Sequence, residues 1–248
     1  MKIGIIGAGN IGGTLARKLA AAGHEVKLSN SRGPDSIREF AREIGVVPVS
    51  TQEAVDGVDV IILSIPFANL RHLAGLLDNV PAEVVVIDTS NYYAFRDQVT
   101  PGFSDGDIES LWVSAQLGRP VIKAWNAVLA GSLADKGLPA GSDGRIALPV
   151  AGDDPAAKAV ALELMEATGF DAVDAGGLEE SWRIQPGNPA YCTDLTAAQL
   201  QAALSMANRS LAPRLRDLGI EGIFSWGKWV NDDIVHLCRA LTRSPARP

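Results

Sequence analysis

The N-terminal stretch Lys2-Ile3-Gly4-Ile5-Ile6-Gly7-Ala8-Gly9-Asn10-Ile11-Gly12 decides the fold. It joins a short apolar segment, typical of a buried parallel strand, to the pattern G-x-G-x-x-G. Leu15, Leu19 and Ala22 follow with helical spacing. A strand, a glycine-rich turn and a helix in this order predict a dinucleotide-binding βαβ unit, in which the pyrophosphate lies at the N-terminus of the helix.

Each of the three glycines has its own predicted task in such a unit. Gly7 lets the chain turn sharply off the strand, and Gly9 leaves no side chain between the backbone and the pyrophosphate. Gly12 allows the following helix to lie close to the strand. We therefore expect all three at the cofactor-binding turn.

The residues after the second predicted strand, 25–28, distinguish the two nicotinamide cofactors. NAD-binding units usually end this strand with Asp or Glu, whose carboxylate binds the ribose hydroxyls and repels an additional phosphate. This chain has Ser29-Asn30-Ser31-Arg32 instead. Hydroxyl groups and a guanidinium suit a 2′-phosphate, so Ser29, Ser31 and Arg32 predict NADP(H) rather than NAD.

The rest of the chain alternates between predicted strands and helices up to residue 174. Further strands are expected at 46–49, 58–63, 83–87, 120–127, 145–152 and 170–174, and helices at 35–44, 67–77, 108–117, 129–136 and from 155. This pattern predicts an α/β fold: a Rossmann-type, doubly wound, mainly parallel sheet with a small helical C-terminal part. We expect a nucleotide domain at 1–177 and a helical region at 178–248.

Polar residues follow several of these strands, where open parallel sheets bind their ligands. Ser64-Ile65-Pro66 ends the fourth strand, Asn91 follows the fifth, and Ala124 to Asn126 ends the sixth. All are expected to border the cofactor. Tyr92 and Tyr93 could form a stacking wall for a planar substrate or could simply cover the sheet edge.

Lys123 precedes Asn126 by three residues, as in the K-x-x-N of 6-phosphogluconate-type dehydrogenases, but the glycine-rich lead of that motif is missing. The sequence therefore favours a strand-end charge over a general acid for Lys123. No carboxylate pair or Ser/His/Asp set stands out elsewhere.

A stripe of leucines marks the C-terminal region: Leu200, Leu204, Leu211 and Leu215 recur at helical spacing, although Pro213 could split the helix. Such a stripe needs a partner surface. We expect it to cover the chain's own crevice or to form a homodimer contact.

Composition excludes several classes of protein. A formal net charge of −7 over 248 residues argues against a nucleic-acid partner. The chain begins with a core strand and has no apolar run of bilayer length, which predicts a cytoplasmic protein with no membrane partner. Cys192, Cys238 and the three histidines lack the spacing of a disulfide framework or a metal site.

Several segments together resemble the NADP oxidoreductase, coenzyme F420-dependent family, from Met1 to about Ala203. They are the glycine fingerprint, Ser31-Arg32, Ser64-Ile65-Pro66, Val121 to Asn126, Pro149 to Asp154, Asp174 to Leu178 and Ser181-Trp182-Arg183. The sequence departs from the archaeal members at the Pro/Gly-rich segment 185–191. The tail 219–248, with Trp226 and Trp229, lies beyond the resemblance.

The resemblance implies that the N-terminal domain binds NADP and that the C-terminal part closes over the nicotinamide so that a deazaflavin can stack on it. The same nucleotide module occurs in six-transmembrane ferric reductases. By this resemblance, Ser31 and Arg32 hold the 2′-phosphate and the backbone N–H groups of Asn10 and Ile11 meet the pyrophosphate. The ends of the fourth and sixth strands would line the hydride-transfer site.

The leading functional hypothesis is an NADPH-dependent oxidoreductase that moves hydride between the nicotinamide and a small-molecule redox acceptor, coenzyme F420 or a flavin. Both partners of such a reaction carry their own chemistry, so the protein needs to position them and no catalytic side chain is required. One alternative is reduction of a small carbonyl or imine, for which Lys123 or a tyrosine would donate a proton. Another is a non-catalytic NADP-binding sensor.

Overall fold

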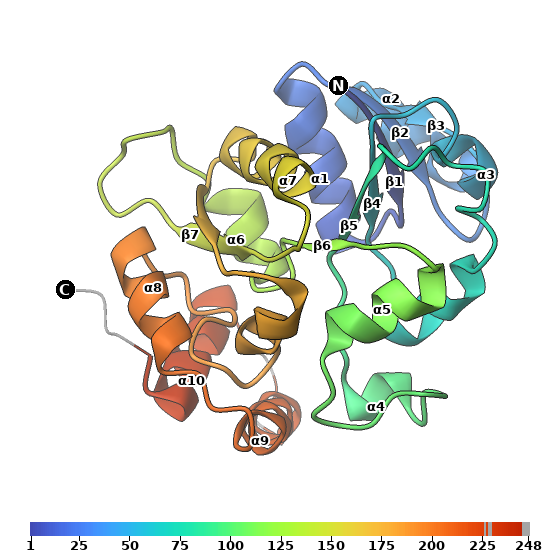
Figure 1. The fold of residues 1–248 in the computed structure, drawn as a ribbon. Coiled ribbons are helices and arrows are strands. Elements are labelled where there is room, and N and C mark those ends of the chain that lie inside the picture. Colours follow the sequence, from blue (N-terminus) through green and yellow to red (C-terminus); the bar gives the residue numbers. More distant parts are fainter. Residues whose placement is uncertain (226, 228–229, 245–248) are drawn as a thin grey trace.

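The computed structural model describes residues 1–225, 227 and 230–244 (Figure 1). Trp226 and Trp229, in the tail beyond the resemblance, lie outside these residues. Within the described part of the chain, every helix is too short or too polar to cross a membrane.

A six-stranded parallel sheet forms the centre of the nucleotide-binding half, in the order β3-β2-β1-β4-β5-β6. This is the strand order of a dinucleotide-binding Rossmann fold, which confirms the predicted fold class. The strands are β1 (Lys2–Ile6), β2 (Glu25–Ser29), β3 (Val47–Pro48), β4 (Val60–Leu63), β5 (Val85–Asp88) and β6 (Ile122–Lys123).

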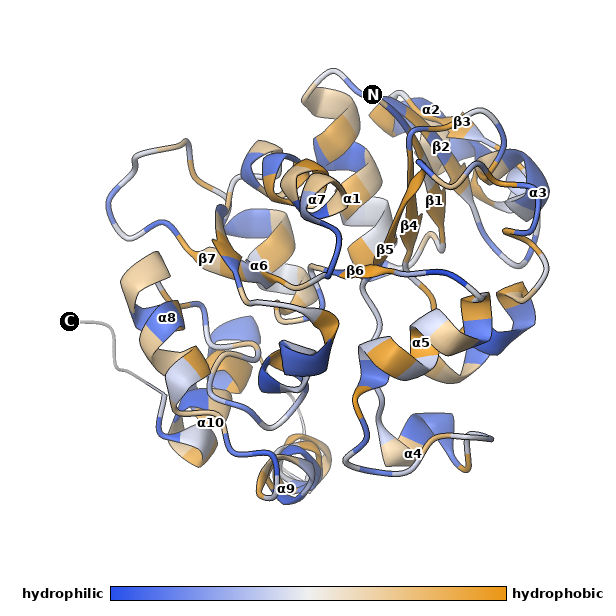
Figure 2. Cartoon of the chain, in the orientation of Figure 1, coloured by the Kyte–Doolittle hydropathy of each residue, from blue (hydrophilic) through white to orange (hydrophobic). Residues whose placement is uncertain are grey.

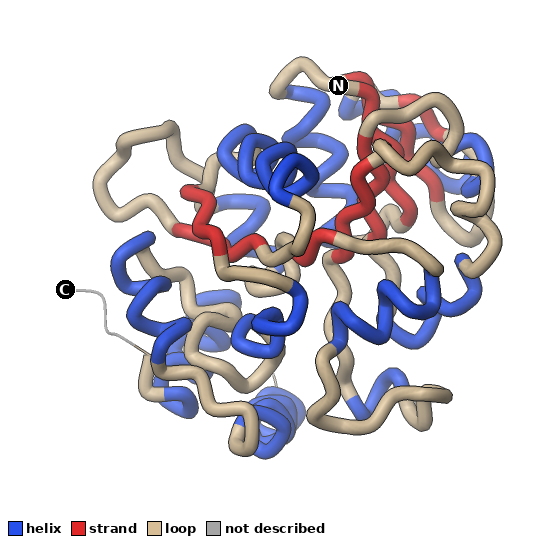
Figure 3. The backbone as a smooth tube through the Cα atoms, viewed as in Figure 1, coloured by secondary structure: helices blue, strands red, loops and turns tan. Residues whose placement is uncertain are grey.

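Two hydrophobic cores lie on opposite faces of this sheet because successive side chains of a strand point to opposite sides. Ile62 contributes to one core, whereas Ile61 and Leu63 contribute to the other. The sheet is accordingly apolar along its strands (Figure 2), and helices cover both faces (Figure 3). Helices on the first face are α1 (Asn10–Ala21), α2 (Arg38–Ile44), α6 (Ala130–Asp135) and α7 (Pro155–Ala167). On the second face lie α3 (Thr51–Ala54), the 3₁₀ segment η2 (Phe67–Leu73) and α5 (Glu109–Leu117). The short segments η1 (Pro34–Ile37) and α4 (Ala94–Asp97) complete this half.

The last two strands, β7 (Ala147–Val150) and β8 (Asp171–Asp174), form a separate parallel pair. An antiparallel bridge between Lys123 and Ala151 joins this pair to β6. The 3₁₀ segment η3 (Leu178–Ile184) and the helices α8 (Ala197–Ser205), α9 (Ala212–Ser225) and α10 (Asn231–Thr242) follow. Figure 1 shows α8, α9 and α10 gathered at one end of the molecule, away from β1 to β5. The proposed boundary between domains at residue 177 stays a prediction.

Several predicted elements are shorter than expected, and for two of them the structure shows a physical reason. The helix predicted at 67–77 is a 3₁₀ segment that ends at Leu73, and its buried side chains Phe67 and Leu70 are three residues apart, the 3₁₀ repeat. The strand predicted at 120–127 pairs only at Ile122–Lys123, because the chain turns away at Trp125, whose φ is 53°.

The structure also corrects the prediction that the four leucines form one stripe. Leu200 and Leu204 belong to α8 and pack against β7 and β8, whereas Leu215 belongs to α9, which begins at Ala212 with Pro213 in its first turn. Of the four leucines, Leu211 is the exposed one at 48%. The four side chains therefore do not form one continuous surface.

Candidate active site

The glycine-rich turn has the geometry that the sequence predicts. Gly7 has a φ of 114°, and a Cβ there would lie 2.1 Å from the Ser64 carbonyl oxygen. A Cβ at Gly12 would lie 1.9 Å from the Gly7 carbonyl oxygen. These two positions exclude any side chain, so Gly7 and Gly12 permit the sharp turn and the close approach of α1 to the sheet. Gly12 does not line the crevice itself.

Gly9 has a different environment, since no atom lies within 4 Å of a Cβ built there. It precedes α1 and provides no capping side chain, and the first turn of α1 carries no acidic residue. The N-terminus of the helix thus offers backbone N–H groups at Asn10 and Ile11 and a positive dipole end toward open space. A pyrophosphate fits the place that a side chain at position 9 would fill.

A cavity of about 600 Å³ lies beside this turn, along the ends of β1 and β2. Ser31 and Arg32 border it with exposed side chains, and the Arg32 guanidinium makes no hydrogen bond or ion pair within the described residues. The Asn30 side-chain oxygen accepts a hydrogen bond from the Arg32 backbone N–H at 3.1 Å and so shapes the loop.

Ser29 does not belong to this group, contrary to the prediction. Its side chain is fully buried, and its hydroxyl donates to the Ile5 carbonyl oxygen at 3.3 Å. Ser29 is the last residue of β2, and its enclosed hydroxyl cannot reach a phosphate in the crevice.

A second cavity, of about 340 Å³, continues from the first. The two share Gly9, Ser64, Ile65 and Pro66 as lining residues, so they form one crevice across the carboxyl ends of the strands. This is the location at which Rossmann folds bind dinucleotides.

Two asparagines from different strand ends meet in the second cavity. Asn91 donates to the Asn126 carbonyl oxygen at 2.8 Å, and Asn126 donates to the Asn91 side-chain oxygen at 3.1 Å and to the Ile184 carbonyl oxygen at 2.8 Å. The Asn126 side-chain oxygen is buried, and so is the Ser90 hydroxyl; neither has a partner among the described residues. Buried polar atoms without partners are rare, and an amide-bearing ring such as nicotinamide could satisfy both.

Tyr93 also faces this cavity and is hydrogen-bonded to Tyr191, which arrives from the loop between η3 and α8. Asn91 donates to the Tyr191 hydroxyl at 3.3 Å. Burial raises the pKa of both tyrosines above the ordinary value, so both hydroxyls stay protonated.

The two neighbouring tyrosines, for which the sequence left two interpretations open, have different environments. Tyr92 packs among Phe67, Phe103 and Trp112 and donates to the Gln98 carbonyl oxygen. Tyr92 therefore covers the sheet edge, whereas Tyr93 forms part of the crevice wall.

Lys123 does not reach the crevice. Its side chain is 0% exposed, and its ammonium group lies 2.7 Å from Asp88 and 2.6 Å from the Ser90 carbonyl oxygen. Glu109 is a further buried neighbour at 3.7 Å. The prediction that Ala124 borders the cofactor is wrong for the same reason. Ala124 is fully buried, and its N–H donates to the Asp88 carbonyl oxygen.

Arg96, Tyr191 and Cys192 are among the residues of the crevice wall that were not predicted from the sequence. Arg96 lies over the Tyr93 ring at 5.3 Å and donates to the Asn91 carbonyl oxygen, while Tyr191 and Cys192 close the far side. Cys192 and Trp125 both have a positive φ, near 54°, and such strained backbone is concentrated at functional sites. The Pro/Gly-rich segment before Tyr191 was the available signal.

Comparison with known proteins identifies a family and several similar chains. Residues 2–92 match the family described as NADP oxidoreductase, coenzyme F420-dependent. The protein YjhV of Escherichia coli (strain K12) is 50% identical over 72 residues, 29% of this chain and 53% of YjhV. The metalloreductase STEAP3 of Rattus norvegicus is 28% identical over 191 residues, 74% of this chain and 36% of STEAP3. The chain thus spans about half and about a third of these two curated relatives.

A solved structure is similar over a larger share of its length. The hypothetical protein SMa0349 of Sinorhizobium meliloti is 30% identical, with a TM-score of 0.69, over 79% of this chain and 95% of that protein. The matched region 2–92 contains the glycine turn, Arg32, Ser64 and Asn91. The match to the NADP oxidoreductase, coenzyme F420-dependent family therefore covers the part of the chain that forms the glycine turn and the Arg32 end of the crevice.

Proposed function

We propose that this chain is an NADPH-dependent oxidoreductase whose crevice holds the whole dinucleotide. The observation that carries the proposal is the continuity of the two cavities through Gly9, Ser64, Ile65 and Pro66. A cationic side chain borders one end of the crevice, a helix N-terminus faces its middle, and amides and hydroxyls line the other end. These are the groups that a 2′-phosphate, a pyrophosphate and a nicotinamide require, in that order.

Each part of the chain has a defined task in this proposal. Arg32 and Ser31 would bind the 2′-phosphate, and the N–H groups of Asn10 and Ile11 would bind the pyrophosphate. Asn126 would accept a hydrogen bond from the carboxamide and so fix the face that the ring presents. Bound NADPH supplies a hydride at its nicotinamide C4; the protein orients that carbon toward the acceptor and excludes water.

For the acceptor, we propose a planar redox ring, coenzyme F420 or a flavin, as the first candidate. Its support is the family that residues 2–92 match. Hydride transfer to such a ring needs no proton-donating side chain, so catalysis would be by positioning alone.

A small carbonyl or imine is a second candidate, and a specific observation favours it. Reduction of such a group needs a proton at the oxygen or nitrogen while hydride arrives at carbon. The Tyr93 and Tyr191 hydroxyls line the cavity that would hold the nicotinamide. Neutral, buried hydroxyls can donate to the developing charge on such an atom.

Incubation of the purified protein with NADPH and a panel of acceptors tests the proposal. The panel contains coenzyme F420, FMN, an aliphatic aldehyde and a cyclic imine, and the readout is loss of the reduced-nicotinamide absorbance. Oxidation of NADPH by one class and not by buffer supports an oxidoreductase. Tight NADPH binding without turnover on any of them would support the sensor instead.

We further propose that the protein is cytoplasmic and a homodimer. The support for a dimer is apolar surface on α4 and α9, where Phe95 and Phe224 are 55% and 68% exposed and their rings meet edge to face at 5.3 Å. A second copy placed over these rings would remove them from water.

A further inference from the structure

Within the second acceptor class, we infer that the substrate is a carbonyl or imine compound with a short, branched apolar substituent, which enters a cavity behind the tyrosine pair. The inference rests on the proposed NADPH-dependent function and distinguishes between its two acceptor classes. It combines two neighbouring features: an apolar cavity between α9 and α10, and the Tyr93 and Tyr191 hydroxyls at its junction with the crevice.

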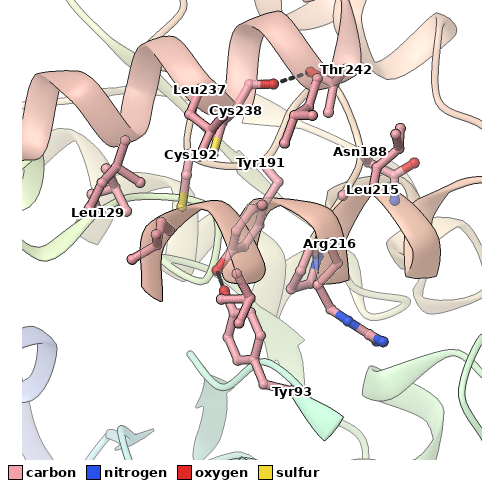
Figure 4. Close-up of a pocket in the computed structure, with 17 residues that line it drawn as sticks. Tyr93, Leu129, Asn188, Tyr191, Cys192, Leu215, Arg216, Leu237, Cys238 and Thr242 are labelled. Atoms are coloured by element: carbon pink, nitrogen blue, oxygen red, sulfur yellow. Dashed lines mark hydrogen bonds between the residues drawn. The ribbon is translucent and has the colours of Figure 1, made fainter. Parts of the chain in front are cut away.

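The cavity has a volume of about 80 Å³ (Figure 4). Leu215, Ile220 and Ile223 line it from α9, and Ile234, Leu237 and Leu241 line it from α10. An engineered apolar cavity of about 150 Å³ holds benzene. A cavity of roughly half that size suits a branched alkyl group better than an aromatic ring.

Both helices that enclose the cavity are fixed to the rest of the molecule. Arg216 of α9 forms two hydrogen bonds with the Asp105 carboxylate, at 2.7 and 2.8 Å. Arg239 of α10 donates to the carbonyl oxygens of Thr193 and Asp194 at 2.6 and 2.8 Å. The space between the helices is therefore bounded by anchored elements and can select ligands by size.

The cavity adjoins the proposed nicotinamide site. Tyr93, Leu129, Tyr191 and Cys192 line both spaces, and Figure 4 shows the two tyrosine hydroxyls meeting at the edge of the apolar cavity. An acceptor placed at this junction would have its polar atom at the hydroxyls and its apolar substituent between α9 and α10. A ring system with several polar groups would leave those groups unpaired there.

The Tyr191 hydroxyl is the proposed proton donor. Either tyrosine can donate in the Tyr93–Tyr191 hydrogen bond; when Tyr93 donates, the Tyr191 oxygen accepts from both Tyr93 and Asn91. The Tyr191 proton then has the Cys192 sulfur as its partner and would turn from it to the polar atom of a bound acceptor. In the proposed step, hydride from nicotinamide C4 forms a C–H bond at the carbonyl carbon, and the C=O π pair moves to oxygen. The Tyr191 proton would form the new O–H bond, and solvent would restore that proton, so NADPH, the carbonyl compound and one solvent proton give NADP⁺ and an alcohol.

Steady-state kinetics with three aldehydes test the cavity. We expect kcat/KM with NADPH to be about tenfold or more higher for isovaleraldehyde than for acetaldehyde or benzaldehyde, as for added methylenes in a fitting pocket. Leu237→Ala, or Ile223→Ala from the other helix, should raise the benzaldehyde to isovaleraldehyde ratio about tenfold. Leu218→Ala, on α9 but outside the cavity, should leave that ratio unchanged.

Tyrosine variants test the proton donor. Tyr191→Phe should lower kcat by about 10²- to 10⁴-fold while the NADPH dissociation constant stays the same. Tyr92→Phe removes the same hydroxyl group one residue from Tyr93 but outside the crevice, and should change kcat less than about twofold.

The results separate this inference from the proposed function. Reduction of F420 or FMN by bound NADPH, with none of the aldehydes reduced, would overturn the inference and leave the proposed function intact. Equal kcat/KM for isovaleraldehyde and benzaldehyde, unaltered by Leu237→Ala, would overturn the role of the cavity. Failure to bind NADPH at all would overturn the proposed function.

Discussion

Lys123 and Asp88 form a fully buried ion pair, with 2.7 Å between the ammonium nitrogen and a carboxylate oxygen. The two residues are also register partners on β6 and β5, so the pair fixes the edge of the sheet next to the crevice. The ammonium group additionally donates to the Ser90 carbonyl oxygen, which holds the loop that leads to Asn91. Lys123 thus positions the site from behind and does not touch the acceptor.

Replacement of Lys123 should therefore affect stability rather than chemistry. Lys123→Met leaves the Asp88 carboxylate buried without its cation, which typically costs about 3–5 kcal/mol of unfolding free energy. The double variant Lys123→Met/Asp88→Asn removes both charges and should recover most of that loss. Urea unfolding measures the unfolding free energy of the single and the double variant. A double variant as unstable as the single one would contradict the ion-pair account.

Glu109 gives the protein a specific pH dependence. Burial raises the pKa of its carboxyl group from 4.5 to about 7, although Lys123 opposes the shift. Between these two pH values the folded state holds a proton that the unfolded chain has lost, so the unfolding free energy contributed by Glu109 falls as pH rises through this window.

Glu109→Gln should remove that contribution. Relative to the parent, the variant should gain stability between about pH 5 and pH 8, by an amount on the order of 3 kcal/mol. Thermal unfolding of both proteins across this range provides the comparison. If the unfolding temperatures of parent and variant changed equally with pH, Glu109 would not titrate in this window.

The glycine turn allows cofactor binding to be separated from folding. Gly9→Ala places a methyl group in open space, at a φ of −79° that alanine adopts freely, so the fold should be retained. That methyl group would lie where the pyrophosphate is proposed to bind, and NADPH affinity should fall by about tenfold or more. Gly12→Ala would instead clash with the Gly7 carbonyl oxygen and should destabilise the protein.

Calorimetric titration and a melting curve for each glycine variant provide the test. If Gly9→Ala bound NADPH as tightly as the parent, the pyrophosphate would have to lie elsewhere.

The proposed homodimer predicts a concentration-dependent mass. Analytical ultracentrifugation at micromolar concentration should show a species of twice 26.1 kDa. Phe224→Glu should shift it to monomer, since a charge would replace an exposed ring of the proposed contact. Leu204→Glu is unsuitable as a probe because Leu204 packs against the β7–β8 core. A parent protein that sediments as a monomer would exclude the dimer.

The sequence was most informative at positions where the backbone geometry allows only one type of residue. The structural tasks of Gly7 and Gly12 in the turn were predicted correctly, because backbone carbonyl oxygens leave no room for a Cβ at either position. The predictions for Ser29 and Ala124 were wrong. Side chains alternate between the two faces of a strand, so the exact end of the strand decides which of them faces the crevice, and that end was not evident from the sequence.

Long-range contacts that do not follow from the order of the strands were beyond prediction. Tyr93 and Tyr191 are 98 residues apart, and no local pattern joins them. The same holds for the leucine stripe, since only the break between α8 and α9 shows that Leu200 and Leu215 face different partners.

The most direct test of the central claim is the affinity for the two reduced nicotinamide cofactors, measured by fluorescence titration. The account predicts that NADPH binds much more tightly than NADH and that Arg32→Ala removes most of this preference, a change of roughly 10- to 100-fold for a charged hydrogen bond. Arg38→Ala provides a matched control, because Arg38 lies on the neighbouring helix outside the crevice and pairs with Asp35. Equal affinities for NADPH and NADH in the parent protein would contradict the account.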